Sequence, residues 1–248
     1  MRETIGSDFR RIAEILAGLS PADPPKLAFL HRASEGTGRG PGTLLCLSAS
    51  FNPMTIAHTA LIREGGRVVP AEEVLLLLAT ANVDKTGEGL PLERRFSLLL
   101  RYAGARPNMS VAAVCHGRFV DKMEAIRRAY PPDIRVVFLL GFDTLTRLFD
   151  AKYYTDRAAA LARLFSQSEC AVANRGPDAP SAVQAFLARP EVSPYAHRIH
   201  LIRLPANIAA VSATVVRTRL ARGEPIAGLV PPEIRAQLEA WVRSQRGP

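Results

Sequence analysis

The stretch LLCLSASFNPMTIAHTALI, from Leu44 to Ile62, predicts the architecture of the whole chain. Its first four residues form an apolar run that is short enough for a buried parallel strand. Small residues then interrupt the run, and Pro53 cannot donate to a strand ladder, so the strand must end before it. Thr55 is a suitable N-cap for the helix that the following apolar spacing predicts. The stretch therefore predicts a strand, a tight loop and a helix.

The loop of this unit is a candidate site for a phosphate group. Ligands of parallel α/β sheets bind at the carboxyl ends of the strands, and free N–H groups at a helix start attract anions. His58 would lie about one turn into the helix, where its ring can point back at the same anion. A histidine near a helix start is also common as a cap or a solvated surface group. The motif by itself leaves both interpretations open.

Length and composition are those of an ordinary globular protein. The chain has 248 residues, of which 48% are hydrophobic and 22% charged, and this suits one α/β domain. No apolar run reaches the ~20 residues of a membrane span. The N-terminus lacks the apolar segment of a secretory signal, and its acidic residues argue against a transit peptide. We therefore expect a cytoplasmic protein, with nuclear or mitochondrial placement left open.

Charge and cysteine usage narrow the classes of partner. The net charge of +9 permits nucleic acid, an anionic surface or small phosphorylated ligands. Lys and Arg are spread along the chain without a basic tail or an aromatic–basic ribbon, so nucleic acid is not indicated. Three cysteines lie in apolar runs without CxxC spacing, and we expect buried free thiols, not metal ligands or disulfides: Cys46, Cys115 and Cys170.

Strand-like and helical patterns alternate along the chain. Strand-like runs are found at 74–79, 109–114, 134–140, 170–173 and 199–204, and helical spacing at 4–19, 91–103, 119–130, 212–222 and from 232 onward. This alternation predicts an α/β fold with a doubly wound parallel sheet and a helical C-terminal end. We expect residues 1–42 to form an N-terminal helix and linker, irregular over 27–41, and residues 43–248 to form the main domain.

A second motif lies near the C-terminus, where VSATVVRTRLARGEPI begins at Val211. Ser212 or Thr214 can cap a helix that Gly223 ends, so local chemistry alone explains the segment as a capped helix. The part from Val211 to Arg217 is nevertheless similar to Ile-Ser-Ser-Thr-x-x-Arg, the second signature of the nucleotidyltransferase superfamily. SASFNPMTIAH, in the opening stretch, is similar to the first signature, Gly-Ser-Phe-(Asp/Asn)-Pro-x-(His/Thr)-x-(Gly/Ala)-His.

The chain thus resembles this superfamily in two places, in the order that the superfamily has. With Asn52 and Thr55 at its two variable positions, the first signature resembles that of the nicotinamide-mononucleotide adenylyltransferase branch. The segment GFDTLTRLFDAKYY is similar to a divergent group of that branch found in fungi and some bacteria. Ala49 stands where Gly is usual, and Ala213 replaces one Ser. The family often places a Trp against the nicotinamide ring after the third strand, whereas the single tryptophan here is Trp241, in the last helix. The missing tryptophan concerns the acceptor: Phe119 can take its place, or the acceptor differs. The resemblance therefore supports the fold and the ATP site more firmly than the acceptor.

The resemblance implies transfer of AMP from ATP to nicotinamide mononucleotide, giving NAD and pyrophosphate, with nicotinate mononucleotide as a further acceptor. Such a displacement needs aligned phosphates and positive charge more than covalent help. Mg²⁺ would be carried by the ATP, so no protein metal site is implied. ATP and a pyridine mononucleotide are the expected partners, without a membrane, and a homo-oligomer is left open. The alternatives are a relative with another phosphorylated acceptor, a weak ATPase, and a non-catalytic nucleotide- or RNA-binding protein.

The resemblance also implies the functional residues. His58, Thr55 and Arg217 are the expected catalytic residues: the first two donate to the triphosphate and the third holds the β- and γ-phosphates in a fork. The expected ATP-binding residues are Ser50, Phe51, Asn52, Thr55, His58, Gly141, Asp143, Ser212, Thr214 and Arg217. The expected acceptor-binding residues are Lys85, Arg95, Phe119 and Arg175. Lys85 can equally be a solvated loop lysine, and Asp143 a helix cap.

Overall fold

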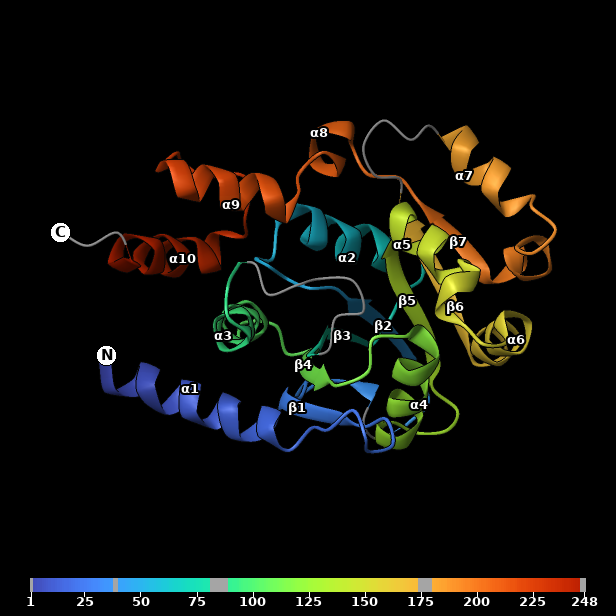
Figure 1. Cartoon of the computed structure of the whole chain (residues 1–248), viewed down its shortest axis with the longest axis horizontal. Coiled ribbons are helices and arrows are strands. Elements are labelled where there is room, and N and C mark those ends of the chain that lie inside the picture. The colour runs from blue at the N-terminus through green and yellow to red at the C-terminus, as the bar shows by residue number, and fades with distance from the viewer. Residues whose placement is uncertain (1, 38–39, 81–88, 174–179, 246–248) are drawn as a thin grey trace.

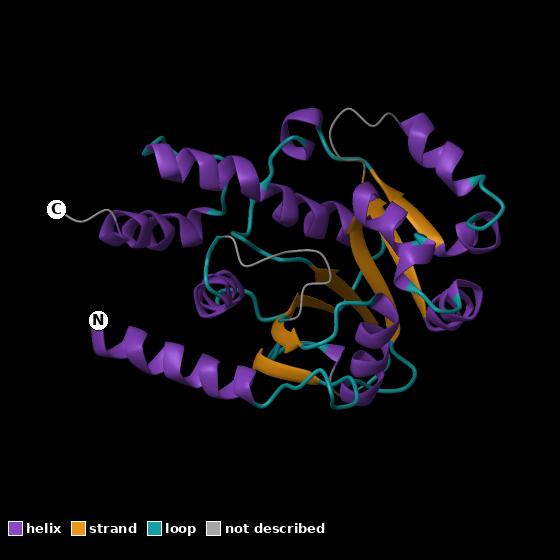
Figure 2. Ribbon diagram, in the orientation of Figure 1, coloured by secondary structure: helices purple, strands orange, loops and turns teal. Residues whose placement is uncertain are grey.

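The computed structural model describes residues 2–37, 40–80, 89–173 and 180–245. Within them, a seven-stranded sheet in the order β1-β4-β3-β2-β5-β6-β7 lies between two layers of helices (Figure 1; Figure 2, strands in orange). The strands from β2 to β7 pair in parallel, which confirms the predicted doubly wound sheet. Their bounds are β1 Leu27–His31, β2 Thr43–Ser48, β3 Glu73–Ala79, β4 Met109–Val114, β5 Arg135–Gly141, β6 Ser168–Ala173 and β7 Ile199–Ile202.

The helices bury two separate apolar cores, one on each face of the sheet. Successive side chains of a strand point to opposite faces, so Leu45 and Leu47 of β2 enter one core while Leu44 and Cys46 enter the other. The first core is covered by α1 Arg2–Ala17, α2 Ile56–Val68, α3 Leu92–Ala103, α8 Ala206–Ala209, α9 Ala213–Arg222 and α10 Pro232–Gln245 (Figure 1). The second is covered by α4 Phe119–Ala129, α5 Phe142–Leu148, α6 Arg157–Gln167, α7 Pro180–Leu187 and η3 Ser193–Arg198. The short helix η2 Ala151–Tyr153 lies between α5 and α6 in the chain and has no buried residue. None of the described helices is long and apolar enough to span a bilayer.

The prediction of irregular structure over 27–41 was wrong for the first five residues of this segment. Residues 27–31 form β1, an edge strand that pairs antiparallel with β4. This strand is short, and its partner lies about 80 residues further along the chain, so no local pattern identifies it. The predicted N-terminal helix is confirmed as α1, and its Phe9 ring lies 6.1 Å from the ring of Trp241 in α10. The domain boundary predicted at residue 42 falls between β1 and β2 and stays a prediction.

The buried carboxylate of Glu73 organises one part of the amino edge of the sheet. It accepts hydrogen bonds from the backbone N–H and the hydroxyl of Thr37, each 3.0 Å long. Ser110 and Tyr130 also donate to it, each at 2.6 Å. These bonds satisfy a group that would otherwise be costly to bury, and they fasten the loop after β1 to β3.

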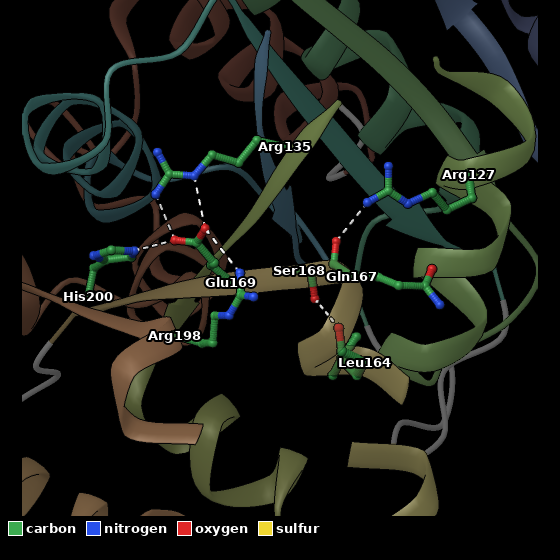
Figure 3. A network of polar contacts seen from close by, with 8 residues as sticks. All are labelled: Arg127, Arg135, Leu164, Gln167, Ser168, Glu169, Arg198 and His200. Atoms are coloured by element: carbon green, nitrogen blue, oxygen red, sulfur yellow. Dashed lines mark hydrogen bonds and ion pairs between the residues drawn. The ribbon is translucent and has the colours of Figure 1, made fainter. Parts of the chain in front are cut away.

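A second carboxylate, Glu169 of β6, joins the amino ends of three neighbouring strands (Figure 3). Arg135 of β5 donates to it through two nitrogens, at 2.9 and 2.7 Å. His200 of β7 lies 2.5 Å from one oxygen of the carboxylate, and Arg198 lies 3.7 Å from the other. The hydrogen bonds from Arg135, with those from His200, lower the pKa of Glu169 to about 2.

All three cysteines are buried and unbridged, as predicted.

Candidate active site

A cavity of about 620 Å³ lies at the carboxyl edge of the sheet, around the ends of β2 and β5. The chain proceeds from β2 to β3 and β4 on one side, and from β5 to β6 and β7 on the other. The loops after β2 and β5 therefore diverge. Ligands of open α/β sheets bind at such a switch point, so the strand order alone explains where the cavity forms.

The cavity brings together most residues of the predicted site. Its lining includes Ser50, Asn52, Thr55, His58, Arg95, Phe119, Gly141, Asp143, Ser212, Thr214 and Arg217. Phe51 is not part of the lining: its side chain is buried in the core, and its ring centre lies 5.3 Å from that of His58. Phe51 therefore supports the His58 ring from the core side. Lys85 and Arg175 lie outside the described residues.

His58 is oriented by the residue that caps its own helix. Thr55 is the N-cap of α2, as predicted, and is fully buried. Its backbone N–H donates to His58 Nδ1 at 3.0 Å, and its hydroxyl oxygen lies 2.9 Å from the same nitrogen. Because a backbone amide can only donate, Nδ1 is the acceptor and the neutral ring carries its proton on Nε2. The described side-chain contact of Thr55 is thus with His58, and its contact with a triphosphate stays a prediction.

Arg217 connects the C-terminal motif to the loop after β2. Ser212 caps α9 by accepting from the N–H of Val215 at 3.2 Å, and Gly223 ends the helix with φ 76°. Arg217 therefore lies in the second turn of α9, where Nη1 donates to the carbonyl of Asn52 at 2.8 Å and Nη2 lies 3.4 Å from the Thr214 hydroxyl. The capped helix start and the guanidinium face the same cavity.

Arg95 of α3 brings a second guanidinium to the same loop. It is 8% exposed and donates to the carbonyls of Leu90, at 2.6 Å, and Ser50, at 3.5 Å. Burial, and then the nearby charge of Arg217, lower the pKa of Arg95. Within the described parts of the chain, neither arginine forms a salt bridge. Two neighbouring cations without a carboxylate partner among the described residues give this end of the cavity a positive potential, which favours anions.

Asn52 positions this loop against the next one. Its side-chain Oδ1 accepts from the N–H of Leu90 at 2.8 Å. Gly89 has φ 106°, and a Cβ placed on it would lie 2.3 Å from the Asn52 amide nitrogen. The close approach therefore requires glycine at that position.

The loop after β5 contributes a carboxylate. Gly141 ends β5 and is the N-cap of α5, so the alternative that Asp143 is the N-cap is wrong. Asp143 lies in the first turn of that helix and forms an ion pair of 3.4 Å with Arg147. Both side chains line the cavity. The chain thus presents an acidic group and a basic group at the start of α5.

The opposite wall of the cavity is aromatic and carries a lysine that the sequence analysis did not identify. Phe119 begins α4 and packs edge-on against Phe138, with 5.2 Å between ring centres. Lys122 is 6% exposed, and its ammonium lies 4.5 Å from the centre of the Phe119 ring. Burial lowers the pKa of Lys122 to about 8. Lys122 lies four residues before the buried Ile126 in α4, and residues at this spacing share one face of a helix. This spacing was the sequence signal that Lys122 faces inward.

Comparison with known proteins identifies relatives over most of the chain. No family model matches it. A probable nicotinate-nucleotide adenylyltransferase of Bordetella petrii is 32% identical over 187 residues, which cover 75% of this chain and 90% of that protein. A Schizosaccharomyces pombe protein assigned as a nicotinamide mononucleotide adenylyltransferase is 29% identical over 192 residues, or 72% of this chain and 76% of that protein.

The fold has also been seen in solved structures. The nicotinic acid mononucleotide adenylyltransferase of Plasmodium falciparum, solved in complex with NaAD, superposes with a TM-score of 0.60 at 14% identity. The superposition covers 83% of this chain and 96% of that one. At this identity, the likeness shows a shared fold.

Proposed function

This chain belongs to the nicotinamide- and nicotinate-nucleotide adenylyltransferase family, and we propose that it transfers AMP from ATP to a pyridine mononucleotide. The products are the dinucleotide, NAD or its nicotinate counterpart, and pyrophosphate. The observation that supports this activity most is the convergence of His58, Arg95 and Arg217 on one cavity with the starts of helices α2 and α9. Helix starts and guanidiniums are the groups that bind phosphates.

In the proposed reaction, an oxygen of the acceptor phosphate attacks the α-phosphorus of ATP. The new P–O bond forms as the bond to pyrophosphate breaks, and negative charge accumulates on the phosphate oxygens. His58 donates its Nε2 proton in a hydrogen bond to the α-phosphate, and Thr55 keeps the ring in that orientation through Nδ1. Arg217 holds the β- and γ-phosphates as pyrophosphate departs. Arg95 was predicted to bind the acceptor, and because it lies beside Arg217 we propose that it contacts the triphosphate instead.

The remaining residues are assigned by their place in the cavity. Ser212 and Thr214, at the start of α9, bind the triphosphate together with Ser50. Gly141 allows the nucleotide close to the backbone, and Asp143 accepts from a hydroxyl of a ribose. Phe119 provides the surface for the pyridine ring. Lys85 and Arg175 remain predicted contacts of the acceptor.

Mg²⁺ is proposed to enter with ATP. Among the described residues, no group of three or more His, Cys, Asp or Glu side chains could hold a metal ion. The cavity end that faces the triphosphate instead carries cations and hydroxyls, which leave the phosphate oxygens as the ligands of a hydrated Mg²⁺. The ion would supply further positive charge along the triphosphate.

The test is a direct assay of dinucleotide formation. Purified protein is mixed with ATP, Mg²⁺ and either nicotinamide or nicotinate mononucleotide, and dinucleotide and pyrophosphate are quantified, with His58→Ala as the control. Dinucleotide formed by the wild type and not by the variant supports the reaction and its site together. ATP consumption with pyridine nucleotides omitted would favour an ATPase, and ATP binding without any transfer would contradict the proposed acceptor.

A further inference from the structure

Lys122 is a buried cation that the proposed transfer of AMP does not use. It is 6% exposed and lines the cavity from α4. Within the described residues, its ammonium forms no hydrogen bond or ion pair, and its recorded contact is with the face of Phe119 at 4.5 Å. An ammonium group without a paired anion is costly to bury, and Asp121, the carboxylate that interacts with it, is itself paired with Arg118. Such a group at the wall of a binding cavity indicates that the ligand supplies the missing anion.

The position of Lys122 separates it from the phosphate-binding groups. His58, Arg95 and Arg217 come from α2, α3 and α9, which cover one face of the sheet, whereas α4 covers the other. The triphosphate already has partners on the first face. The anion that meets Lys122 must therefore belong to a different part of the bound molecules.

The surroundings of Lys122 are those of an aromatic ring site. Phe119 and Phe138 stand edge to face at 5.2 Å, and Tyr154 lies on the same cavity lining. A flat heterocycle can pack on such a surface. An anionic substituent of that heterocycle would then lie beside the ammonium that contacts the Phe119 ring.

We propose that Lys122 binds the carboxylate of the pyridine ring and makes this enzyme select nicotinate mononucleotide over nicotinamide mononucleotide. The inference rests on the proposed function and extends it to the choice of acceptor. A carboxylate neutralises the buried ammonium, whereas the neutral carboxamide of nicotinamide leaves the charge uncompensated. Lys122 is therefore a specificity-determining residue.

If Lys122 binds the carboxylate, its titration makes the preference between the two acceptors depend on pH. Burial lowers its pKa to about 8, so the lysine of the free enzyme loses its proton over the range from about pH 7 to about pH 9. The titratable groups that interact with Lys122 are Cys46 of β2 and Asp121, which is paired with Arg118, and Tyr154 lines the same cavity. The pKa values of Cys46 and Tyr154 are raised to about 12, so neither thiol nor phenol ionises in this range.

The experiment compares Lys122→Met and Lys122→Gln with the wild type on both acceptors. We expect kcat/KM for nicotinate mononucleotide to fall on the order of 10- to 100-fold in both variants, mainly through KM, since the carboxylate is remote from the reacting phosphorus. The value for nicotinamide mononucleotide should change by less than about threefold. Lys26→Met, which removes an exposed lysine, is the matched control. Thermal unfolding of each variant verifies that the fold is retained.

A second experiment follows the ratio of kcat/KM for nicotinate mononucleotide to kcat/KM for nicotinamide mononucleotide as the pH is varied. Ionisations that affect both acceptors equally cancel in this ratio. In the wild type, the preference for nicotinate should decline as the pH rises through about 8, and in the variants the ratio should be independent of pH. Equal losses for both acceptors would assign Lys122 to the shared phosphate or to the fold and overturn the inference. The inference would also be overturned if the variants kept the wild-type ratio of the two kcat/KM values. A wild type that forms no dinucleotide with either acceptor would instead refute the proposed function on which the inference rests.

Discussion

Arg217 of α9 donates a hydrogen bond of 2.8 Å to the main-chain carbonyl of Asn52, a residue 165 positions earlier in the chain. This contact joins the two sequence motifs into one site. It also places a guanidinium at the loop between β2 and α2, where Arg95 already lies. Burial, and then the nearby charge of Arg217, lower the pKa of Arg95, so the two guanidiniums lie close enough to interact.

Arg217→Lys should therefore reduce activity although the charge is kept. A lysine loses the planar fork that reaches Asn52 and the phosphates together. We expect kcat/KM for ATP to fall about 10- to 100-fold. Initial rates of pyrophosphate release at varied ATP concentration provide the measurement. An enzyme with unchanged kinetics would remove Arg217 from the site.

His58→Ala should lower kcat by about 10²-fold or more, because the Nε2 donor to the α-phosphate is lost.

Thr55→Val should lower kcat by less than His58→Ala does. In this variant the backbone N–H still holds Nδ1 of His58, and only the hydroxyl contact is removed. Rates are compared under saturating substrates, and urea unfolding shows whether stability is affected. A Thr55→Val enzyme that loses as much activity as His58→Ala would mean that Thr55 contacts the triphosphate directly.

Gly89→Ala should damage both stability and activity. Its φ of 106° is unfavourable for alanine, and the added Cβ would collide with the Asn52 side chain. We expect a loss of about 1–3 kcal/mol in the free energy of unfolding and a raised KM for ATP. Gly66→Ala, in α2, is the matched control, because the nearest side-chain atom lies 4.0 Å from its Cβ position. Equal behaviour of the two variants would contradict the tight packing at Asn52.

Glu169→Gln should destabilise the protein in a way that depends on pH. The pKa of Glu169 is lowered from 4.5 to about 2, mainly by Arg135. A lowered carboxyl pKa stabilises the fold above the unfolded value, and this contribution is lost as the pH falls from about 4.5 toward about 2. At pH 7 the variant should lose about 1–2 kcal/mol, less than the full shift implies because Arg135 is half exposed.

The check on Glu169 is urea denaturation at neutral and acid pH, with Glu224→Gln as control. Glu224 pairs with its arginines only at 3.8 and 3.9 Å and is more exposed. The difference between Glu169→Gln and the wild type should shrink at about pH 3 and below. A difference that is independent of pH would show that the ion pair is not its cause.

Much of the fold follows from local patterns in the chain. The apolar run at 44–47 and the cap at Thr55 predicted β2 and α2, and the capping residues Ser212 and Gly223 bound α9 as expected. The predicted elements include no helix over 157–167, where α6 forms. The side chain of Asp156 accepts from the N–H of Ala159 and caps this helix, so a local signal was present there.

The candidate site was predicted in part by its motifs and in part by resemblance. Residue types at helix starts indicated phosphate binding, but only the resemblance connected the segment around His58 with that around Arg217. The burial of Phe51 and the contact between Thr55 and His58 could not be foreseen, because both depend on how the loop after β2 closes over the core.

The sequence by itself determined the parallel strands, most of the helices that connect them and the two motifs, since these depend on neighbours within a few residues along the chain. The tertiary structure decided the edge strand β1 and the meeting of Arg95 with Arg217. These features arise from contacts between segments that are far apart in sequence or on different faces of the sheet. Strand pairing and burial are properties of the packed chain, and no local pattern encodes them.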